Sequence, residues 1–225
     1  MEMYMTQHVV VTGANRGIGL AFVKQYLAKG FNVTAVVRKA SDDLTATSAT
    51  IIDGIDVASE SDIEKLQQQL ANKPVDLLIN NAGIFHNETL SNIDFENIQR
   101  QLEVNAIAPV RVTHALQQQL TKGAKVAMIT SRMGSISDNG SGGYIGYRMS
   151  KAALNAASKS LAIELANREV NVAILHPGFV QTEMVGYAGD ISPEVSASRL
   201  IERIDALSLE NTGTFWHSNG EELPW

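Results

Sequence analysis

The sequence predicts an α/β fold, a doubly wound parallel sheet of about seven strands with helices on both faces. Short runs rich in Val and Ile recur along the chain, and longer amphipathic segments separate them. This alternation is typical of parallel strands that are buried on both faces of a sheet. No linker rich in Pro, Gly or Ser and no run of charges divides the 225 residues. We therefore expect a single domain that spans residues 1–225.

Each expected strand is a run of a few apolar residues, as buried strands often are. The strand candidates are residues 8–12, 32–37, 50–52, 75–79, 125–130, 171–175 and 213–216. Helical patterns fall between them at residues 18–29, 61–71, 95–120, 147–167 and 193–207. Ser61 and Glu64 have the spacing of a capping box. Ligands of such sheets bind outside the carboxyl ends of the strands, so the strand-to-helix loops are the predicted site.

Composition narrows the classes of function. Hydrophobic residues make up 44% of the chain and the net charge is −6, which favours a globular protein and argues against a nucleic-acid partner. Cysteine is absent and the five histidines lack ligand spacing, so we expect no metal. No apolar stretch approaches the ~18 residues that cross a bilayer, and residues 1–7 lack a secretory pattern. A cytoplasmic protein without membrane association is expected.

The first expected strand leads into the sequence TGANRGIG at residues 12–19, and a helical pattern follows. Glycines there permit a tight turn and close approach of a pyrophosphate, and a helix N-terminus favours an anion. A glycine-rich turn can also be purely structural, but this position favours a bound dinucleotide. The residues expected to hold it in this loop are Gly13, Asn15, Arg16, Gly17, Ile18 and Gly19.

The spacing T-G-x-x-x-G-x-G resembles that of the short-chain dehydrogenase/reductase family. Further motifs follow in the family's order: Asp56, the sequence NNAG at residues 80–83, Asn105, Ser131, Tyr147-x-x-x-Lys151, and the sequence PGFVQT at residues 177–182. This ordered set spans almost the entire chain. The resemblance implies a Rossmann fold and an NAD(P)-dependent oxidoreductase.

The end of the second expected strand bears on which nicotinamide cofactor is used. An acidic residue there binds the ribose of NAD, whereas a nearby Arg accommodates the 2′-phosphate of NADP. Arg38 stands at this end and Arg16 lies in the glycine loop, so NADP is favoured over NAD. Asp42 and Asp43 follow closely and leave NAD open, and both cations could simply be solvated. The resemblance adds further cofactor-binding residues: Asp56, Val57, Asn81, Ala82, Gly83, Tyr147, Lys151, Pro177, Gly178, Val180 and Thr182.

Tyr147 and Lys151 are four residues apart on an expected helix, so their side chains share one face. A neighbouring ammonium lowers the pKa of a phenol because it stabilises the phenolate. In the family this Tyr gives a proton to the substrate carbonyl while hydride leaves the nicotinamide, and the Lys also holds the nicotinamide ribose. The resemblance likewise implies that Ser131 binds the substrate oxygen and that Asn105 holds a water. Tyr144 and Ser135 are the nearby rivals of Tyr147 and Ser131.

The ending of the chain, with SP at residues 192–193, NTGTF at residues 211–215 and GEELPW at residues 220–225, resembles the C-factor branch of the family and its carbonyl-reductase-like relative, sniffer. The sequence NRGIGL at residues 15–20 fits this group too. We therefore expect an NADPH-dependent carbonyl reductase or alcohol dehydrogenase that acts on a small or medium aldehyde or ketone. The alternative is an NAD(P)-binding sensor or cell-signalling protein with little turnover. Leu223, Pro224 and Trp225 are expected to dock on the domain or on a partner subunit. The family resemblance also suggests a homodimer or homotetramer, built through helices 95–120 and 147–167.

Overall fold

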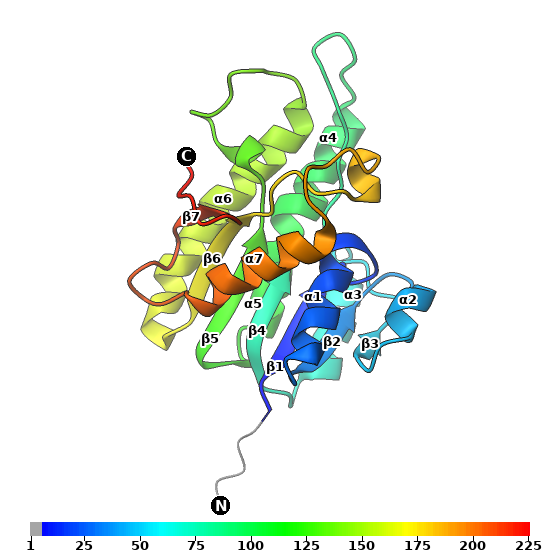
Figure 1. The fold of residues 1–225 in the computed structure, drawn as a ribbon, viewed down its shortest axis with the longest axis vertical. Helices are drawn as coiled ribbons and strands as arrows, with labels where there is room; N and C mark the ends of the chain where they lie inside the picture. The colour runs from blue at the N-terminus through cyan, green and yellow to red at the C-terminus, as the bar shows by residue number, and fades with distance from the viewer. Residues whose placement is uncertain (1–5) are drawn as a thin grey trace, which may run out of the picture.

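A computed structural model of the chain describes residues 6–225. They form one seven-stranded sheet in the order β3-β2-β1-β4-β5-β6-β7, with helices on both faces (Figure 1). All six neighbouring strand pairs are parallel. The predicted doubly wound parallel sheet of seven strands is therefore confirmed. The expectation of no secretory segment concerns residues 1–7, and the first five of these lie outside the described residues.

The chain alternates strand and helix from end to end. The strands are β1 (His8–Thr12), β2 (Asn32–Val36), β3 (Thr50–Ile52), β4 (Val75–Asn80), β5 (Leu120–Ile129), β6 (Asn171–His176) and β7 (Phe215–His217). The α-helices are α1 (Gly17–Ala28), α2 (Asp42–Thr45), α3 (Glu60–Leu70), α4 (Phe95–Leu102), α5 (Ala108–Leu116), α6 (Ile145–Leu165) and α7 (Pro193–Asp205). A π-helical turn, η1 (Glu103–Ile107), joins α4 to α5, and short 3-10 turns lie at η2 (Arg132–Gly134), η3 (Ala166–Arg168) and η4 (Glu183–Val185).

The sheet separates two hydrophobic cores. Helices α1 and α7 pack side by side on one face, with Phe22 and Leu200 in that core. Helices α3, α5 and α6 cover the other face, where Leu66 and Leu154 are buried. Successive residues of β1 enter opposite cores because side chains alternate along a strand. Burial on both faces explains why the strands are continuous apolar runs.

The strand order reverses at β1, which lies between β2 and β4. The chain goes from β1 to β2 on one side and reaches β4 on the other, so the loops after β1 and β4 diverge. A crevice opens where such loops part at the carboxyl edge of a sheet. This topology positions the site described below.

One expected helix, residues 95–120, is not continuous. It is α4, the π turn η1 and α5, and α5 ends at Leu116. The last residue of the expected helix, Leu120, instead begins β5, which was expected to start at Lys125. Leu120 pairs with Val75, the register then shifts, and Lys125 pairs with Leu77. The irregular polar stretch between the two pairs hides the start of this strand from the sequence pattern.

Three smaller boundaries also differ. The capping residue of α3 is Ser59 and not Ser61, because the Ser59 hydroxyl accepts the Asp62 N–H at 3.3 Å. Helix α6 begins at Ile145, two residues before the expected start. Strand β7 begins at Phe215 because Gly213 adopts a left-handed conformation, with φ of 73°.

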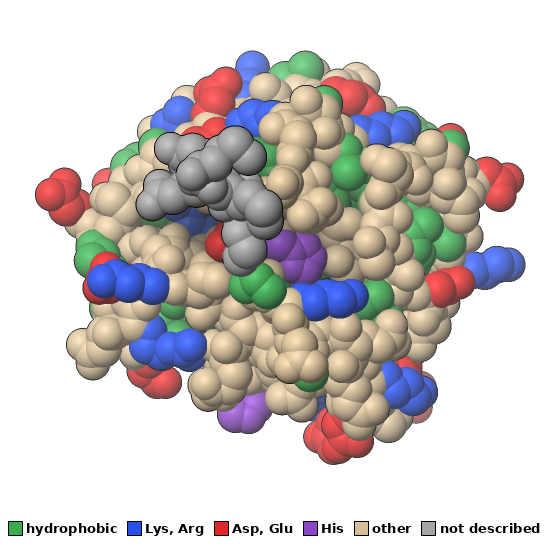
Figure 2. Space-filling view, turned by 90° about the horizontal axis from the view of Figure 1, so that it is seen from below, with side chains coloured by type: hydrophobic (Ala, Val, Ile, Leu, Met, Phe, Trp, Pro, Cys, Tyr) green, Lys and Arg blue, Asp and Glu red, His purple; other side chains and the backbone are tan. Residues whose placement is uncertain are grey.

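The end of the chain docks on its own domain, one of the two expected outcomes. Leu223 is buried in the core between α6 and the sheet, and its N–H donates to the Phe215 carbonyl at 2.8 Å. The face at the other end of the molecule, seen from below in Figure 2, carries basic and acidic side chains interspersed. Within residues 6–225, no helix combines the length and the apolar character needed to cross a membrane.

Candidate active site

A cleft of about 680 Å³ opens at the carboxyl edge of the sheet. Its walls come from the glycine loop after β1, the ends of β2 and β4, helix α6 and the loop after β6. Every residue expected to bind the cofactor lines this cleft except Gly178 and Val180. Val180 is buried and forms a bridge with Ile191, and Gly178 lies against Ile191 with φ of 92°. The structure thus brings together residues from five separate loops.

The loops after β1 and β4 are tied to each other at the floor of the cleft. The Thr12 hydroxyl accepts the N–H groups of Asn81 and Ala82 at 3.1 and 3.2 Å. The Asn81 side chain donates to the carbonyl of Gly13 at 3.0 Å. A Cβ on Gly13, whose φ is 63°, would lie 2.7 Å from the Ala82 Cα. Glycine is therefore required where the two backbones meet.

The start of α1 faces the cleft with unsatisfied backbone donors. In the described part of the chain, no side chain caps this helix, and its first turn holds no acidic residue. The first N–H groups of a helix lack intrahelical partners, and the helix dipole places partial positive charge there. Gly17 and Gly19 line the cleft in this turn and let the backbone approach a ligand closely. These residues fit the pyrophosphate of a dinucleotide.

Two cations follow β2 at one end of the cleft. Arg38 and Lys39 both line it, although only Arg38 was expected to bind the cofactor. Arg16 also lines the cleft, but its guanidinium pairs with the Glu183 carboxylate at 2.6 Å, across the opening. The Asp56 carboxylate accepts the Ala58 N–H at 3.0 Å and lies on the wall beside Val57. This end of the cleft suits a phosphate.

Tyr147 and Lys151 lie on one face of α6 at the other end of the cleft. The Lys151 ammonium is 5.8 Å from the centre of the Tyr147 ring and donates to the Ile129 carbonyl at 3.0 Å. Burial raises the pKa of Tyr147 to about 12, and the nearby Ser131 hydroxyl offsets part of that rise. Burial lowers the pKa of Lys151 to about 8.

The two rivals of the expected catalytic residues make other contacts. The Ser135 hydroxyl accepts the Asp138 N–H at 3.1 Å within its own loop. Tyr144 adopts a left-handed conformation, with φ of 52°, and its ring packs against Phe85 at 5.5 Å between centroids. Ser131 and Tyr147 are the serine and tyrosine that the structure brings together.

Asn105 lies behind the cleft wall and not in it. It is fully buried in the π turn η1, where its side chain makes three hydrogen bonds. It accepts the N–H of Ile84 at 2.8 Å and donates to the Ile84 carbonyl and the Ser150 hydroxyl at 2.9 and 3.0 Å. Asn105 therefore fixes the loop after β4 against α6, the helix of Tyr147.

Several residues of the site were not foreseen. Phe85 packs edge-on against the Tyr147 ring, with centroids 4.9 Å apart. It directly follows the cleft residue Ile84, so its place after the β4 loop was the available signal. The cleft is also lined by residues from other elements that the sequence motifs did not include: Ile55, Arg100, Val104 and Pro193.

The histidines do not form a metal centre in the described residues, where no group of three or more His, Cys, Asp or Glu side chains converges. His176 ends β6 just before the cleft residue Pro177 and packs edge-on against His217, with ring centroids 4.8 Å apart. Burial, with the nearby His217, lowers the pKa of His176 to about 3. Its imidazole is therefore uncharged at neutral pH.

Residues 7–191 match the sequence profile of the short chain dehydrogenase family. The chain belongs to this family. Family membership, together with a dehydrogenase relative, supports the assignment to an NAD(P)-dependent oxidoreductase. The chain is 38% identical over 223 residues to 1-hydroxy-2-glutathionyl-2-methyl-3-butene dehydrogenase of Rhodococcus sp. (strain AD45), covering 96% of this chain and 99% of that protein. It is 42% identical over 155 residues to C-signal of Myxococcus xanthus, covering 68% of this chain and 93% of that protein.

Solved structures of the short-chain dehydrogenase family have the same fold over nearly the whole chain. Carbonyl reductase Sniffer of D. melanogaster aligns with a TM-score of 0.90 and 27% identity, covering 99% of this chain and 100% of that one. An NADPH-bound carbonyl reductase from chicken fatty liver aligns with a TM-score of 0.88 and 28% identity, covering 98% and 99%. The resemblance to the C-factor and sniffer branch of the family is thereby confirmed.

Proposed function

We propose that this short-chain dehydrogenase is an NADPH-dependent carbonyl reductase that acts on a small or medium aldehyde or ketone. The observation that carries the proposal is that one cleft has a candidate acid at one end and two cations at the other. Tyr147 and Lys151 occupy one end, with Ser131 close to Tyr147, while Arg38 and Lys39 occupy the other. An acid for a carbonyl oxygen thus stands at one end of a groove whose other end can hold a phosphate.

The bound cofactor would supply the hydride that adds to the carbonyl carbon of the substrate. Tyr147 donates its hydroxyl proton to the carbonyl oxygen, and Ser131 orients that oxygen with a second hydrogen bond. Lys151 is protonated below its pKa of about 8, so at neutral pH it supplies a positive charge beside the phenol. That charge stabilises the phenolate left after proton transfer. The hydrogen bonds of Asn105 hold the loop after β4 against helix α6 during this step.

The preference for NADPH rests on the cations after β2. Loss of one charge-assisted contact with a phosphate typically costs about 1.5–3 kcal/mol, or roughly tenfold or more in affinity. We expect Arg38→Ala to weaken NADPH binding by about that factor and to leave NADH binding unchanged. Titration of cofactor fluorescence measures both affinities. Lys24→Ala, on the exposed side of α1, is the matched control.

The direct test is oxidation of NADPH and NADH in the presence of a panel of aldehydes, ketones and quinones. We expect turnover with NADPH and at least one carbonyl compound. Binding of cofactor without turnover across the panel would overturn the reductase proposal. That result would favour the alternative, a nucleotide-binding signalling protein, for which the identity with C-signal is the specific support. Failure to bind either nucleotide would contradict both.

A further inference from the structure

The last residues of the chain fold back along the edge strand of the sheet. The His217 N–H donates to the Glu221 carbonyl and the Leu223 N–H to the Phe215 carbonyl, both at 2.8 Å. These bonds make residues 221–223 an antiparallel partner of β7. The Trp225 indole then stacks on Phe215, with ring centroids 5.4 Å apart and planes at 29°. Because Phe215 is 1% exposed, the core itself fixes the position of Trp225.

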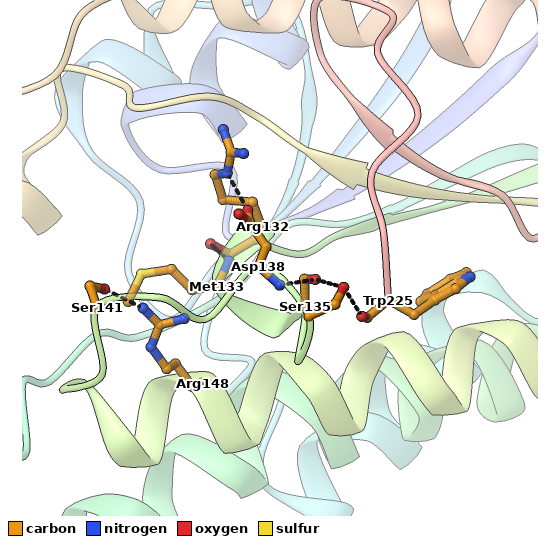
Figure 3. A network of polar contacts seen from close by, with 9 residues as sticks. Arg132, Met133, Ser135, Asp138, Ser141, Arg148 and Trp225 are labelled. Atoms are coloured by element: carbon orange, nitrogen blue, oxygen red, sulfur yellow. Dashed lines mark hydrogen bonds and ion pairs between the residues drawn. The ribbon is translucent and has the colours of Figure 1, made fainter.

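The main-chain oxygen of Trp225 is bonded to the loop between β5 and α6. The Ser137 N–H donates to it at 3.0 Å and the Ser137 hydroxyl at 2.6 Å. Figure 3 shows Trp225 at one end of a chain of polar contacts that continues into this loop. Two bonds therefore connect segments that are 88 residues apart in sequence.

The same chain of contacts leads from Ser137 back toward Ser131. The Ser135 hydroxyl lies 3.4 Å from the Ser137 hydroxyl and accepts the Asp138 N–H. The Asp138 carboxylate in turn accepts a hydrogen bond from Nε of Arg132 at 2.8 Å (Figure 3). The Gly134 N–H closes the turn on the Ser131 carbonyl at 2.8 Å. Residues 131–138 thus form one hydrogen-bonded unit.

This unit is held from two sides. On its inner side Gly134 packs against α6 so closely that a Cβ would lie 2.7 Å from the carbonyl carbon of Lys151. On its outer side it is bonded to Trp225. Ile136, beside Ser137, is 82% exposed, so the unit gains little from burial at that point. The Trp225 contact therefore carries much of the restraint on the outer side.

We infer that Trp225 is a positioning residue for Ser131: its main-chain oxygen, held by stacking of the indole on Phe215, fixes the loop that presents the Ser131 hydroxyl to Tyr147. The restraint on the loop follows from the geometry alone. Its catalytic consequence rests on the proposed function. Two experiments separate these claims.

The first experiment measures the restraint without any substrate. Amide hydrogen exchange of Gly134, Ser135, Ser137 and Asp138 is compared between wild type and Trp225→Ala. Loss of the stacking frees the end of the chain, so we expect these amides to exchange about tenfold faster. Leu209→Ala, half-exposed on the connection between α7 and β7, is the control and should leave them unchanged. Unchanged protection in Trp225→Ala would overturn the inference.

A second variant distinguishes a local loss of restraint from general unfolding caused by Trp225→Ala. Ser137→Ala removes the hydroxyl bond to Trp225 and leaves the indole and the core intact. We expect a smaller acceleration, about threefold, confined to residues 131–138. Acceleration spread evenly over α6 and the sheet in either variant would contradict a local restraint.

The second experiment asks whether the restraint reaches catalysis. In Trp225→Ala we expect kcat to fall about threefold to tenfold while KM for NADPH stays unchanged. The basic limb of the pH–rate profile should also move to higher pH, because the Ser131 hydroxyl lowers the pKa of Tyr147. In a Ser131→Ala background both effects should vanish. Equal effects in both backgrounds would contradict action through Ser131. Should wild type show no turnover, the exchange experiment alone decides the positional claim.

Discussion

The guanidinium of Arg16 lies 2.6 Å from the carboxylate of Glu183, and this ion pair joins the glycine loop to the loop after β6. Both side chains are more than half exposed, so the pair contributes at most about 1 kcal/mol to stability. Its significance lies in its position at the opening of the cleft. A cofactor 2′-phosphate that recruits Arg16 must draw this guanidinium away from Glu183.

Glu183→Gln should therefore tighten NADPH binding. Removing a competitor worth up to about 1 kcal/mol corresponds to a gain of about twofold to fivefold in affinity. NADH lacks the 2′-phosphate, so its affinity should stay the same. Isothermal titration at low salt measures both, with Glu194→Gln at the start of α7 as an exposed control. An equal change for the two nucleotides would contradict the competition.

Asn105→Ala should destabilise the fold strongly. The substitution leaves the half-buried N–H and carbonyl of Ile84 and the buried Ser150 hydroxyl without the Asn105 partner. Buried polar groups without partners cost about 1–3 kcal/mol each, so the free energy of unfolding should fall by about 2–4 kcal/mol. Urea unfolding measures this, and Gln99→Ala on the exposed side of α4 is the control. A loss no larger than that of the control would show that water replaces the amide.

Gly19→Ala should disrupt the floor of the cleft. A Cβ at this position would collide with the Gly13 carbonyl and lie 2.6 Å from Nδ2 of Asn81. Because Asn81 ties the β1 and β4 loops together, we expect cofactor affinity to fall by about tenfold or more. Gly140→Ala, where a Cβ meets open space, is the matched control. Normal binding by Gly19→Ala would show that the loops can part without loss of the site.

Lys151 should impose a specific pH dependence on stability. Its pKa falls from the usual 10.5 to about 8 on folding, so between these values the unfolded chain holds more protons. The free energy of unfolding of wild type should then rise with pH across this window, relative to Lys151→Met, by at most about 3 kcal/mol. Urea unfolding at pH 7.5, 9 and 10 follows the difference. A constant difference would mean that Lys151 keeps its ordinary pKa.

Much of the cleft could be predicted because its residues follow strands. Parallel strands end at one edge of the sheet, so motifs after β1, β2, β4 and β6 converge there whatever separates them in sequence. The four-residue spacing of Tyr147 and Lys151 predicted only that they share a helix face, and the resemblance to the family singled them out as the candidate catalytic pair.

The remaining features depend on contacts that no local pattern records. The π turn at Glu103–Ile107 interrupts the helical hydrogen bonding between α4 and α5 within one continuous helical pattern of the sequence. Asn105 is bonded to Ile84 and Ser150, 21 and 45 residues away. The start of β5 is masked by Thr121, Lys122 and Gly123, where the register shifts. Pairings such as that of Ser137 with Trp225 depend on the complete fold.

The most direct test of the central claim follows deuterium from NADPH labelled at the reactive C4 position, with an aldehyde or ketone that the enzyme reduces. Wild type should transfer the label to the carbonyl carbon of the alcohol product. Tyr147→Phe should bind NADPH as wild type does and lose about 10²–10⁴-fold in the rate of transfer, the usual contribution of a general acid. Undiminished transfer by Tyr147→Phe would contradict the assignment of Tyr147 as the proton donor.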